Sequence, residues 1–290
     1  MTVVALSRGG ATLPDGTAIK AVDLALEVLD PALFEGVDVV FHLAGIAHQQ
    51  AEQEAYSALN HGASVSLAKV AAAQGVKCFI YLSSVKAMGL PADGTMRGEN
   101  DCVHPVDAYG LSKLQAEQDL RALSGGNAMS MIILRPCLVY GAAPKGNLAR
   151  LARAVRAGLP RPPEVGGRSM IAVGDLVELM IEIASRSSPR SGTWIVSDGN
   201  RYSLRVIYDF MRQAMNKQPG FNWMPMWAWR LAAFMADGLR RKGVDSTYDK
   251  LFGTEVYSNA ALLQDFEWRP KQCLADVVAA MVNTPAEVEE

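Results

Sequence analysis

Short apolar runs rich in strand-forming residues alternate with amphipathic stretches through most of the chain up to residue 200. In the amphipathic stretches the apolar residues recur every three to four positions, which is the period of a helix that covers a sheet. This alternation predicts an α/β fold with a doubly wound, Rossmann-like parallel sheet. The expected strands are residues 2–8, 19–24, 37–45, 78–84, 131–136 and 193–197, and the expected helices are residues 52–74, 111–120, 148–157 and 176–185.

The pattern changes beyond residue 141, where a Pro-rich stretch and further helical segments follow. We predict a Rossmann-like domain over residues 1–144 and 169–198, and a smaller, mainly helical domain over residues 145–168 and 199–290. Within the smaller domain, residues 222–242 hold three of the five tryptophans and end in Arg-Arg-Lys. Aromatic residues beside a basic end also occur in helices that lie on a membrane surface. Packing in the core or at a subunit interface is the preferred interpretation of this segment.

Composition narrows the class of protein. The 290 residues are 50% hydrophobic and 20% charged, with a formal net charge of −2, which is the balance of an ordinary soluble enzyme and offers no basic field for nucleic acid. The four cysteines are widely spaced and neither they nor the histidines form a metal-ligand pattern. No leader pattern opens the chain and no apolar run reaches the roughly 18 to 20 residues of a membrane span. We therefore predict a cytoplasmic protein with no transmembrane segment and no bound metal.

Candidate chemistry begins at the helix expected after Pro105. Tyr109 and Lys113 are four residues apart and share one helix face, about one turn from each other. An ammonium beside a phenol favours the phenolate, so we expect the pKa of Tyr109 to fall from about 10 towards neutrality. A tyrosine of this kind can pass a proton to or from a sugar or alcohol oxygen. An exposed helix pair is the alternative, because this spacing alone is weak evidence.

The flanking strands strengthen the catalytic interpretation. Ser83 and Ser84 end one expected strand, and Arg135 and Pro136 end another. Ligands of an open parallel sheet bind outside the carboxyl ends of its strands, so these residues should meet there. A hydroxyl, a phenol and an ammonium at such a place form a proton relay with an oxyanion donor.

Three motifs in order carry a family resemblance: Tyr81-Leu-Ser-Ser84, Tyr109-Gly-Leu-Ser-Lys-x-x-x-Glu117 and Leu134-Arg-Pro-x-x-Val-Tyr-Gly141. The chain resembles the extended short-chain dehydrogenase/reductases, and within them the nucleotide-sugar epimerase/dehydratase/4-ketoreductase group. The resemblance implies that Tyr109 is the acid/base, that Lys113 tunes it and holds the nicotinamide ribose, and that Ser84 bonds the reacting oxygen. It also places at Asn60 an amide that steadies the active-site helix, with a surface asparagine as the alternative.

The beginning of the sequence departs from that family. Residues 2–8 match its second strand, and the first strand, the Gly-x-x-Gly-x-x-Gly turn and the first helix have no counterpart. Neither Gly9-Gly10 nor Gly125-Gly126 has the strand–glycines–helix context of a pyrophosphate-binding turn. We expect that a longer natural protein has lost, or been recorded without, roughly 30 residues. A genuine short form without normal cofactor binding is the alternative, and in either case open strand edges should remain.

The resemblance assigns further cofactor contacts. Ser7 and Arg8 stand where members that prefer NAD carry an acid, and an arginine suits a 2′-phosphate instead. The expected cofactor is therefore NADP, and NAD is the alternative. Arg8 could instead be a solvated arginine in a loop, with no role in cofactor binding. The other residues implied to contact the cofactor are Asp23, Leu24, Ala44, Gly45 and Pro136, together with Tyr109 and Lys113.

The implied substrate contacts lie mostly in the smaller domain. Asn147, Leu148 and Arg168 match the positions that hold a nucleotide-sugar diphosphate in the family, and a guanidinium fork is well suited to phosphate oxygens. Arg168 as a surface charge is the alternative. Lys86, which we also assign to the substrate, replaces the acid that dehydratases carry beside the catalytic hydroxyl, and this argues against dehydration.

Taken together, these residues imply hydride transfer at C4 of a nucleotide-linked sugar. We expect a UDP-sugar 4-ketoreductase, slightly ahead of a 4-epimerase, in surface polysaccharide or lipopolysaccharide synthesis. One alternative is a truncated, non-catalytic remnant that binds a nucleotide sugar or a partner. Another is a hydroxysteroid-type reductase, which would not need Asn147 or Arg168. The resemblance also implies a homodimer through the two long helices, whose apolar faces could equally pack within the chain.

Overall fold

The computed structural model describes residues 2–47, 52–90, 94–126, 128–144, 146–221, 224–239 and 246–283. The chain divides into two compact units. Unit 1 contains residues 1–88, 104–135 and 183–193, and unit 2 contains residues 89–103, 136–182 and 194–290. Each unit is a group of residues that contact one another more than they contact the rest of the chain. The division into a Rossmann-like domain and a smaller helical domain, given above, remains a prediction.

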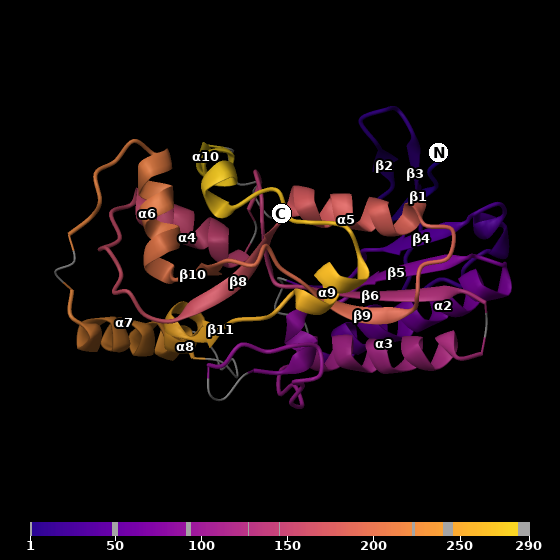
Figure 1. Cartoon of the computed structure of the whole chain (residues 1–290), viewed down its shortest axis with the longest axis horizontal. Helices are drawn as coiled ribbons and strands as arrows, with labels where there is room; N and C mark the ends of the chain where they lie inside the picture. The colour runs from indigo at the N-terminus through magenta and orange to yellow at the C-terminus, as the bar shows by residue number, and fades with distance from the viewer. Residues whose placement is uncertain are drawn as a thin grey trace. The chain divides into compact units, whose positions relative to one another are not determined.

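Unit 1 contains strands β4 and β5 and most of β6 of a parallel sheet (Figure 1). The strands of this sheet follow the order β4-β5-β6-β9, and β5 is parallel to both β4 and β6. The β5 residues Cys78 to Tyr81 are all buried, as expected of a strand covered on both faces. This arrangement confirms the predicted α/β, Rossmann-like fold. The strands are β4 (Val39–His42), β5 (Cys78–Leu82), β6 (Ser130–Pro136) and β9 (Gly192–Val196).

Helices α2 (Ser64–Ala73) and α3 (Ala108–Ser124) pack on this sheet, and in Figure 1 α3 runs along β5 and β6. Their small and branched residues meet the sheet in one buried cluster that includes Leu67, Ala71, Ala116, Leu120, Phe79, Tyr81, Met131 and Ile133. The helix predicted over residues 52–74 is interrupted. It consists of α1 (Gln53–Tyr56), a π-helical segment η2 (Ser57–Ala63) and α2. Two short 3₁₀ turns, η1 (Pro31–Phe34) and η3 (Val85–Met88), complete the helical parts near this sheet.

A second, small sheet in unit 1 has the order β1-β3-β2, with β1 parallel to β3 and β2 antiparallel to it. Among the described residues no ladder joins β1 to β4, so each strand is the edge of its own sheet. Apolar side chains beside these edges are exposed, including Val4 at 49% and Leu43 at 55%. The open strand edges predicted from the sequence are therefore confirmed. The strands of this sheet are β1 (Ala5–Ser7), β2 (Ala11–Thr12) and β3 (Ala18–Ala21).

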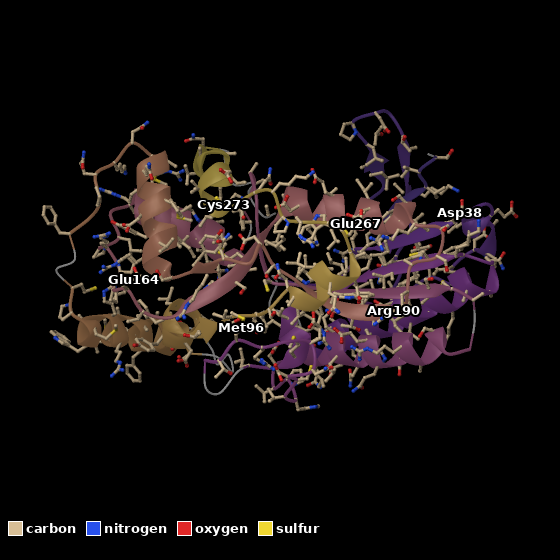
Figure 2. The ribbon with its side chains drawn as sticks, viewed as in Figure 1. Asp38, Met96, Glu164, Arg190, Glu267 and Cys273 are labelled. Atoms are coloured by element: carbon tan, nitrogen blue, oxygen red, sulfur yellow. The ribbon has the colours of Figure 1, made fainter. Side chains whose placement is uncertain are left out.

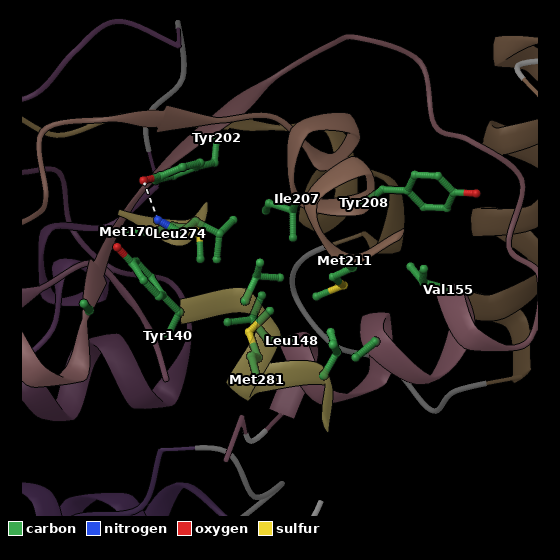
Figure 3. Packing of buried hydrophobic residues seen from close by; sticks show 14 residues of the cluster. Tyr140, Leu148, Val155, Met170, Tyr202, Ile207, Tyr208, Met211, Leu274 and Met281 are labelled. Atoms are coloured by element: carbon green, nitrogen blue, oxygen red, sulfur yellow. Dashed lines mark hydrogen bonds between the residues drawn. The ribbon is translucent and has the colours of Figure 1, made fainter. Parts of the chain in front are cut away.

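Unit 2 is built around strand β8 (Gly167–Ala172), which pairs with β7, β10 and β11. Helices α4, α6 and α10 pack their apolar faces together beside it, as Figure 3 shows for Leu148, Ile207, Met211, Leu274 and Met281. The surrounding elements are β7 (Leu138–Tyr140), α4 (Gly146–Arg156), β10 (Arg201–Tyr202), α6 (Leu204–Ala214), β11 (Thr254–Glu255) and α10 (Leu274–Asn283).

The remaining helices are α5 (Val173–Ser185), α7 (Met226–Leu239), α8 (Thr247–Phe252) and α9 (Ala260–Asp265). None of the helices in the described ranges has the length and apolarity needed to cross a membrane. Charged side chains such as Asp38, Glu164 and Glu267 are exposed (Figure 2). Across the described part of the chain, His, Cys, Asp and Glu side chains form no group that could hold a metal ion.

Candidate active site

Helix α3 carries the two residues that the spacing singled out. It begins after Asp107, whose Oδ1 accepts a hydrogen bond from Gly110 N at 2.8 Å and caps the first turn. Tyr109 therefore lies in the first turn and Lys113 one turn later on the same face. The first turn lies close against η3, because a Cβ on Gly110 would be 2.5 Å from the carbonyl oxygen of Lys86. Only glycine allows this approach.

Lys113 is buried, with 4% of its surface exposed. Its Nζ donates a hydrogen bond to the carbonyl oxygen of Leu82 at 2.9 Å and lies 4.7 Å from the centroid of the Tyr81 ring. Burial lowers the pKa of the Lys113 ammonium to about 8, while the charge of Glu117 acts in the opposite direction. The ammonium thus remains protonated at neutral pH but gives up its proton more readily than an exposed lysine.

The expected fall in the pKa of Tyr109 is not what the structure shows. Burial raises the pKa of its phenol, the nearby Ser84 hydroxyl lowers it, and the charge of Asp107 raises it again, with a net increase. The spacing of Tyr109 and Lys113 places a cation one turn away, which favours the phenolate, but burial of the phenol acts more strongly here. In the protein alone, Tyr109 is a protonated phenol at neutral pH.

The two hydroxyls at the end of β5 have different surroundings. Ser84 is half-buried, lies near the Tyr109 phenol and accepts a hydrogen bond from Lys86 N at 3.2 Å. Ser83 is buried, and its Oγ donates to Glu117 Oε1 at 2.5 Å. Ser84 is therefore the hydroxyl that stands with the phenol, and Ser83 joins the strand to α3.

Asn60 lies in the π-helical segment and is completely buried, so the surface alternative was wrong. Its Nδ2 donates to Ser112 Oγ at 3.2 Å on α3 and to Ile46 O at 3.0 Å, and its Oδ1 accepts from Ile46 N at 2.8 Å. A Cβ on Gly45 would be 2.9 Å from Asn60 Oδ1 and 3.3 Å from Lys113 Nζ. The loop after β4 is therefore linked to α3 by the side-chain amide of Asn60 and by the close approach of Gly45 to Lys113. π-Helical segments of this kind are frequent at functional sites.

Glu117 and Arg135 form a buried ion pair that the sequence pattern did not predict. Arg135 Nη2 lies 2.6 Å from Glu117 Oε2, and Glu117 also accepts from Arg121 Nη2 at 2.7 Å. The available signal was spacing, since Tyr109, Lys113 and Glu117 follow one another at four-residue intervals on one face of α3. The cation that would pair with the glutamate could not be chosen from the sequence.

The other residues predicted to contact a cofactor lie at or shortly after the ends of strands β1, β3, β4 and β6. Ser7 ends β1 and Arg8 follows it, and both are exposed. Asp23 and Leu24 come shortly after β3, where Asp23 Oδ1 accepts from Ala25 N at 2.9 Å. Ala44 and Gly45 come after β4, and the buried Pro136 is the last residue of β6.

The predicted substrate residues are divided between the units. Lys86 lies in η3 of unit 1, whereas Asn147, Leu148 and Arg168 belong to unit 2. Asn147 is exposed on the first turn of α4, and Leu148 is buried in the core, so only its backbone could meet a ligand. Arg168 Nη2 donates to the carbonyl oxygen of Lys250 at 2.7 Å. Burial lowers the pKa of Arg168, and the charge of Glu255 raises it.

Unit 1 fits one end of a nicotinamide dinucleotide. The Lys113 ammonium has three donor hydrogens, and its hydrogen bond to Leu82 O uses one of them. With the bare backbone at Gly45, it suits the hydroxyls of a nicotinamide ribose. The pyrophosphate end has no matching turn in this sequence, because β1 continues through Gly9 and Gly10 into β2 and not into a helix.

The comparisons with known proteins agree with this geometry. Residues 3–196 match the model of the NAD dependent epimerase/dehydratase family, and the chain belongs to this family. It is 30% identical over 281 residues to a UDP-glucose 4-epimerase of Vibrio cholerae, covering 93% of this chain and 83% of that protein. The family indicated by the sequence motifs is thus confirmed.

Solved structures share the fold. MoeE5 in complex with UDP-glucuronic acid and NAD superposes with a TM-score of 0.74 at 22% identity, covering 96% of this chain and 89% of that one. The UDP-glucose 4-epimerase of Thermus thermophilus, in complex with NAD, gives 0.70 at 21% identity, covering 93% and 85%.

Proposed function

We propose that this protein transfers hydride at C4 of a UDP-linked sugar, and that it does so as a 4-epimerase. The observation that carries the proposal is the constellation on α3 and just beyond β5: Ser84 near the Tyr109 phenol, with the buried Lys113 one turn away on α3. The Vibrio cholerae relative, aligned over most of both chains, supports epimerase chemistry ahead of the ketoreductase that the sequence favoured. The ketoreductase remains the second candidate, because the Ser7-Arg8 pair suits the NADPH pool on which reductases draw.

Each of the three residues has a definite task in this proposal. The Ser84 hydroxyl bonds the oxygen on C4, and Tyr109 exchanges a proton with that same oxygen. Epimerisation would need Tyr109 first as the phenolate, which takes the proton of the C4 hydroxyl when hydride leaves C4, and then as the phenol, which returns that proton when hydride comes back. The raised pKa of Tyr109 favours the phenol, the form that donates in the second half. Lys113 stabilises the phenolate that this donation leaves behind, since an adjacent cation favours the charged form.

A bound nicotinamide would supply the hydride acceptor and donor. Lys113 and Gly45 would hold its ribose, and Asp23, Leu24, Ala44 and Pro136 are proposed to contact other parts of the cofactor. Arg8 with Ser7 would bind a 2′-phosphate, so we propose NADP in preference to NAD. The family and the solved neighbours establish only that nicotinamide cofactors are used by relatives of this chain.

For the sugar nucleotide, we propose that Arg168 and Asn147 bind the diphosphate. A guanidinium has five donor hydrogens, and the bond to Lys250 O accounts for one of them. The backbone of Leu148 and the ammonium of Lys86 complete the proposed contacts. Activated sugars with an inverted C4 feed surface polysaccharide and lipopolysaccharide synthesis, and we propose a cytoplasmic role there.

The test is to incubate the purified chain with UDP-glucose or UDP-N-acetylglucosamine and with NAD or NADP, and to follow the C4 epimer by NMR. Deuterium placed at C4 of the substrate should remain in the product of an epimerase. For the reductase alternative the substrate is instead a 4-keto UDP-sugar, and deuterium supplied on NADPH should then enter its product. Tyr109→Phe and Lys113→Met should abolish turnover, and Lys77→Met, at an exposed lysine, should not. Absence of both turnover and nicotinamide-nucleotide binding in the wild-type chain would contradict the proposal.

A further inference from the structure

Helix α7 of unit 2 has two apolar faces. On one of them Trp229 and Ala233 are 5% and 3% exposed, and the Trp229 ring meets Phe252 edge to face at 5.6 Å. This face packs into a cluster with Leu204 and Phe252. The expectation of core packing for this segment therefore holds for the inner face of α7.

The outer face of α7 consists of Trp227, Leu231, Phe234 and Met235. Their exposed fractions are 68%, 49%, 76% and 55%. Positions 227, 231, 234 and 235 fall on one stripe of a helix, and Trp227 points about 200° away from Trp229 at 100° per residue. Phe221, shortly before α7, is 86% exposed. Soluble proteins rarely leave so many large apolar side chains together in water, and such patches mark interaction surfaces.

The size of this stripe fits a second copy of the chain as well as a lipid surface, so the charges around it decide between the two occupants. An aromatic side chain presents about 150 to 250 Å², so the four residues at their observed exposure offer roughly 500 Å². A stable protein interface buries about 800 Å² from each partner, of which somewhat more than half is non-polar, so the area of the stripe would also suit such an interface. A lipid surface sets no minimum area, because each apolar side chain that enters the interface contributes separately.

The charges around the stripe suit an anionic surface. Arg230 is exposed on α7, with its guanidinium 5.3 Å from the centroid of the Tyr248 ring. The acid on this helix, Asp237, is bonded to Thr247 N at 3.0 Å. In the sequence, α7 is followed by Arg240, Arg241 and Lys242, which lie outside the described residues. Although the whole chain is slightly acidic, this segment is basic, and basic segments are attracted to anionic lipid headgroups.

We propose that the outer face of α7 docks unit 2 on the surface of a bilayer that contains anionic phospholipid. Trp227, Leu231, Phe234 and Met235 enter the boundary between headgroups and acyl chains, and Arg230 contacts phosphate. The attachment is peripheral, in keeping with the absence of a spanning helix from the described residues.

The test is sedimentation of the full chain with vesicles of phosphatidylglycerol and phosphatidylcholine in equal parts, and with vesicles of phosphatidylcholine alone. The chain should bind the anionic vesicles, and the double variant Trp227→Glu/Phe234→Glu should lower the partition coefficient at least about tenfold. The matched control is Leu26→Glu/Val28→Glu, at side chains in unit 1 that are 84% and 98% exposed, and it should bind like wild type. Circular dichroism melts of both double variants verify folding.

A second measurement is tryptophan fluorescence in vesicles whose lipids are brominated on their acyl chains, because bromine quenches tryptophans that enter the membrane. Quenching should be seen in wild type and should fall in Trp227→Phe, which keeps the stripe apolar. Three results overturn the proposal: no binding to anionic vesicles, equal loss of binding in the two double variants, or a wild-type dimer that the α7 variant separates while vesicles bind neither form.

Discussion

Arg135 and Glu117 form a buried ion pair that ties helix α3 to the end of strand β6. Arg135 Nη2 lies 2.6 Å from Glu117 Oε2 and Arg135 Nε lies 2.9 Å from Oε1, and the side chains are 2% and 0% exposed. Ser83 Oγ, at the end of β5, donates to the same carboxylate at 2.5 Å. One carboxylate therefore sets the position of α3, which carries Tyr109 and Lys113, against two neighbouring strands.

Breaking this pair should be strongly destabilising. Glu117→Gln leaves the Arg135 guanidinium buried without its counter-charge, and we expect a loss of about 3 to 5 kcal/mol in the free energy of unfolding, measured in urea. Asp119→Asn is the control, because it interrupts a pair with His61 in which the aspartate is 55% exposed, and its effect should stay within about 1 kcal/mol. Similar small losses in both variants would show that the buried pair contributes little.

Lys113 should make stability depend on pH. Burial lowers its pKa in the folded state to about 8, below the value of 10.5 for an ordinary lysine. Between these values the unfolded chain holds a proton that the folded chain has released, so the contribution of Lys113 to stability rises with pH through this window and is constant below it. Unfolding in urea from pH 7 to 10 should therefore show wild type gaining about 2 to 3 kcal/mol relative to Lys113→Met.

Lys77→Met provides the control for that pH dependence. Lys77 is exposed, and its pKa is raised by Asp38, first through a hydrogen bond and then through charge. The difference in the free energy of unfolding between Lys77→Met and wild type should therefore stay constant from pH 7 to 10. A flat difference for Lys113→Met as well would mean that the buried ammonium keeps an ordinary pKa.

Gly110→Ala should disturb the first turn of α3. The added Cβ would be 2.5 Å from Lys86 O and 2.9 Å from Asp107 Oδ2, and a backbone oxygen cannot give way as a flexible side chain does. We expect a loss of about 1 to 3 kcal/mol in thermal or urea unfolding, as for other overpacked sites. Gly125→Ala, where the nearest atom is at 3.8 Å, is the matched control and should be nearly neutral. An unchanged melting temperature in Gly110→Ala would contradict the tight approach of α3 to η3.

The cysteines should differ in reactivity. Cys102 is exposed, whereas Cys78 and Cys137 are buried and burial raises their thiol pKa, to about 11 for Cys78. Ellman's reagent at neutral pH should modify Cys102 in the folded chain and reach Cys78 and Cys137 only on unfolding, since the thiolate is the reactive form. Peptide mapping identifies the modified thiols, and early labelling of Cys78 would contradict its burial in β5.

Local features were determined by the sequence alone. The alternation of apolar runs and amphipathic stretches predicted the strands and helices of unit 1, because side-chain periodicity follows directly from strand and helix geometry. The spacing of Tyr109 and Lys113 placed them on one helix face for the same reason. The order of motifs around them identified the family that the comparisons confirm.

Tertiary structure decided what depends on burial and on residues distant in the chain. The net rise in the pKa of Tyr109 comes first from desolvation, which no local spacing reveals. The bond of Ser83 to Glu117, and the choice of Arg135 as the partner of Glu117, depend on where strand ends meet a helix. Helix α7 shows the same limit, since its pattern is apolar on both sides. Packing of α7 against the rest of unit 2 buries Trp229 and leaves Trp227 exposed to water, because a helix at the surface can pack only one of its faces against the core.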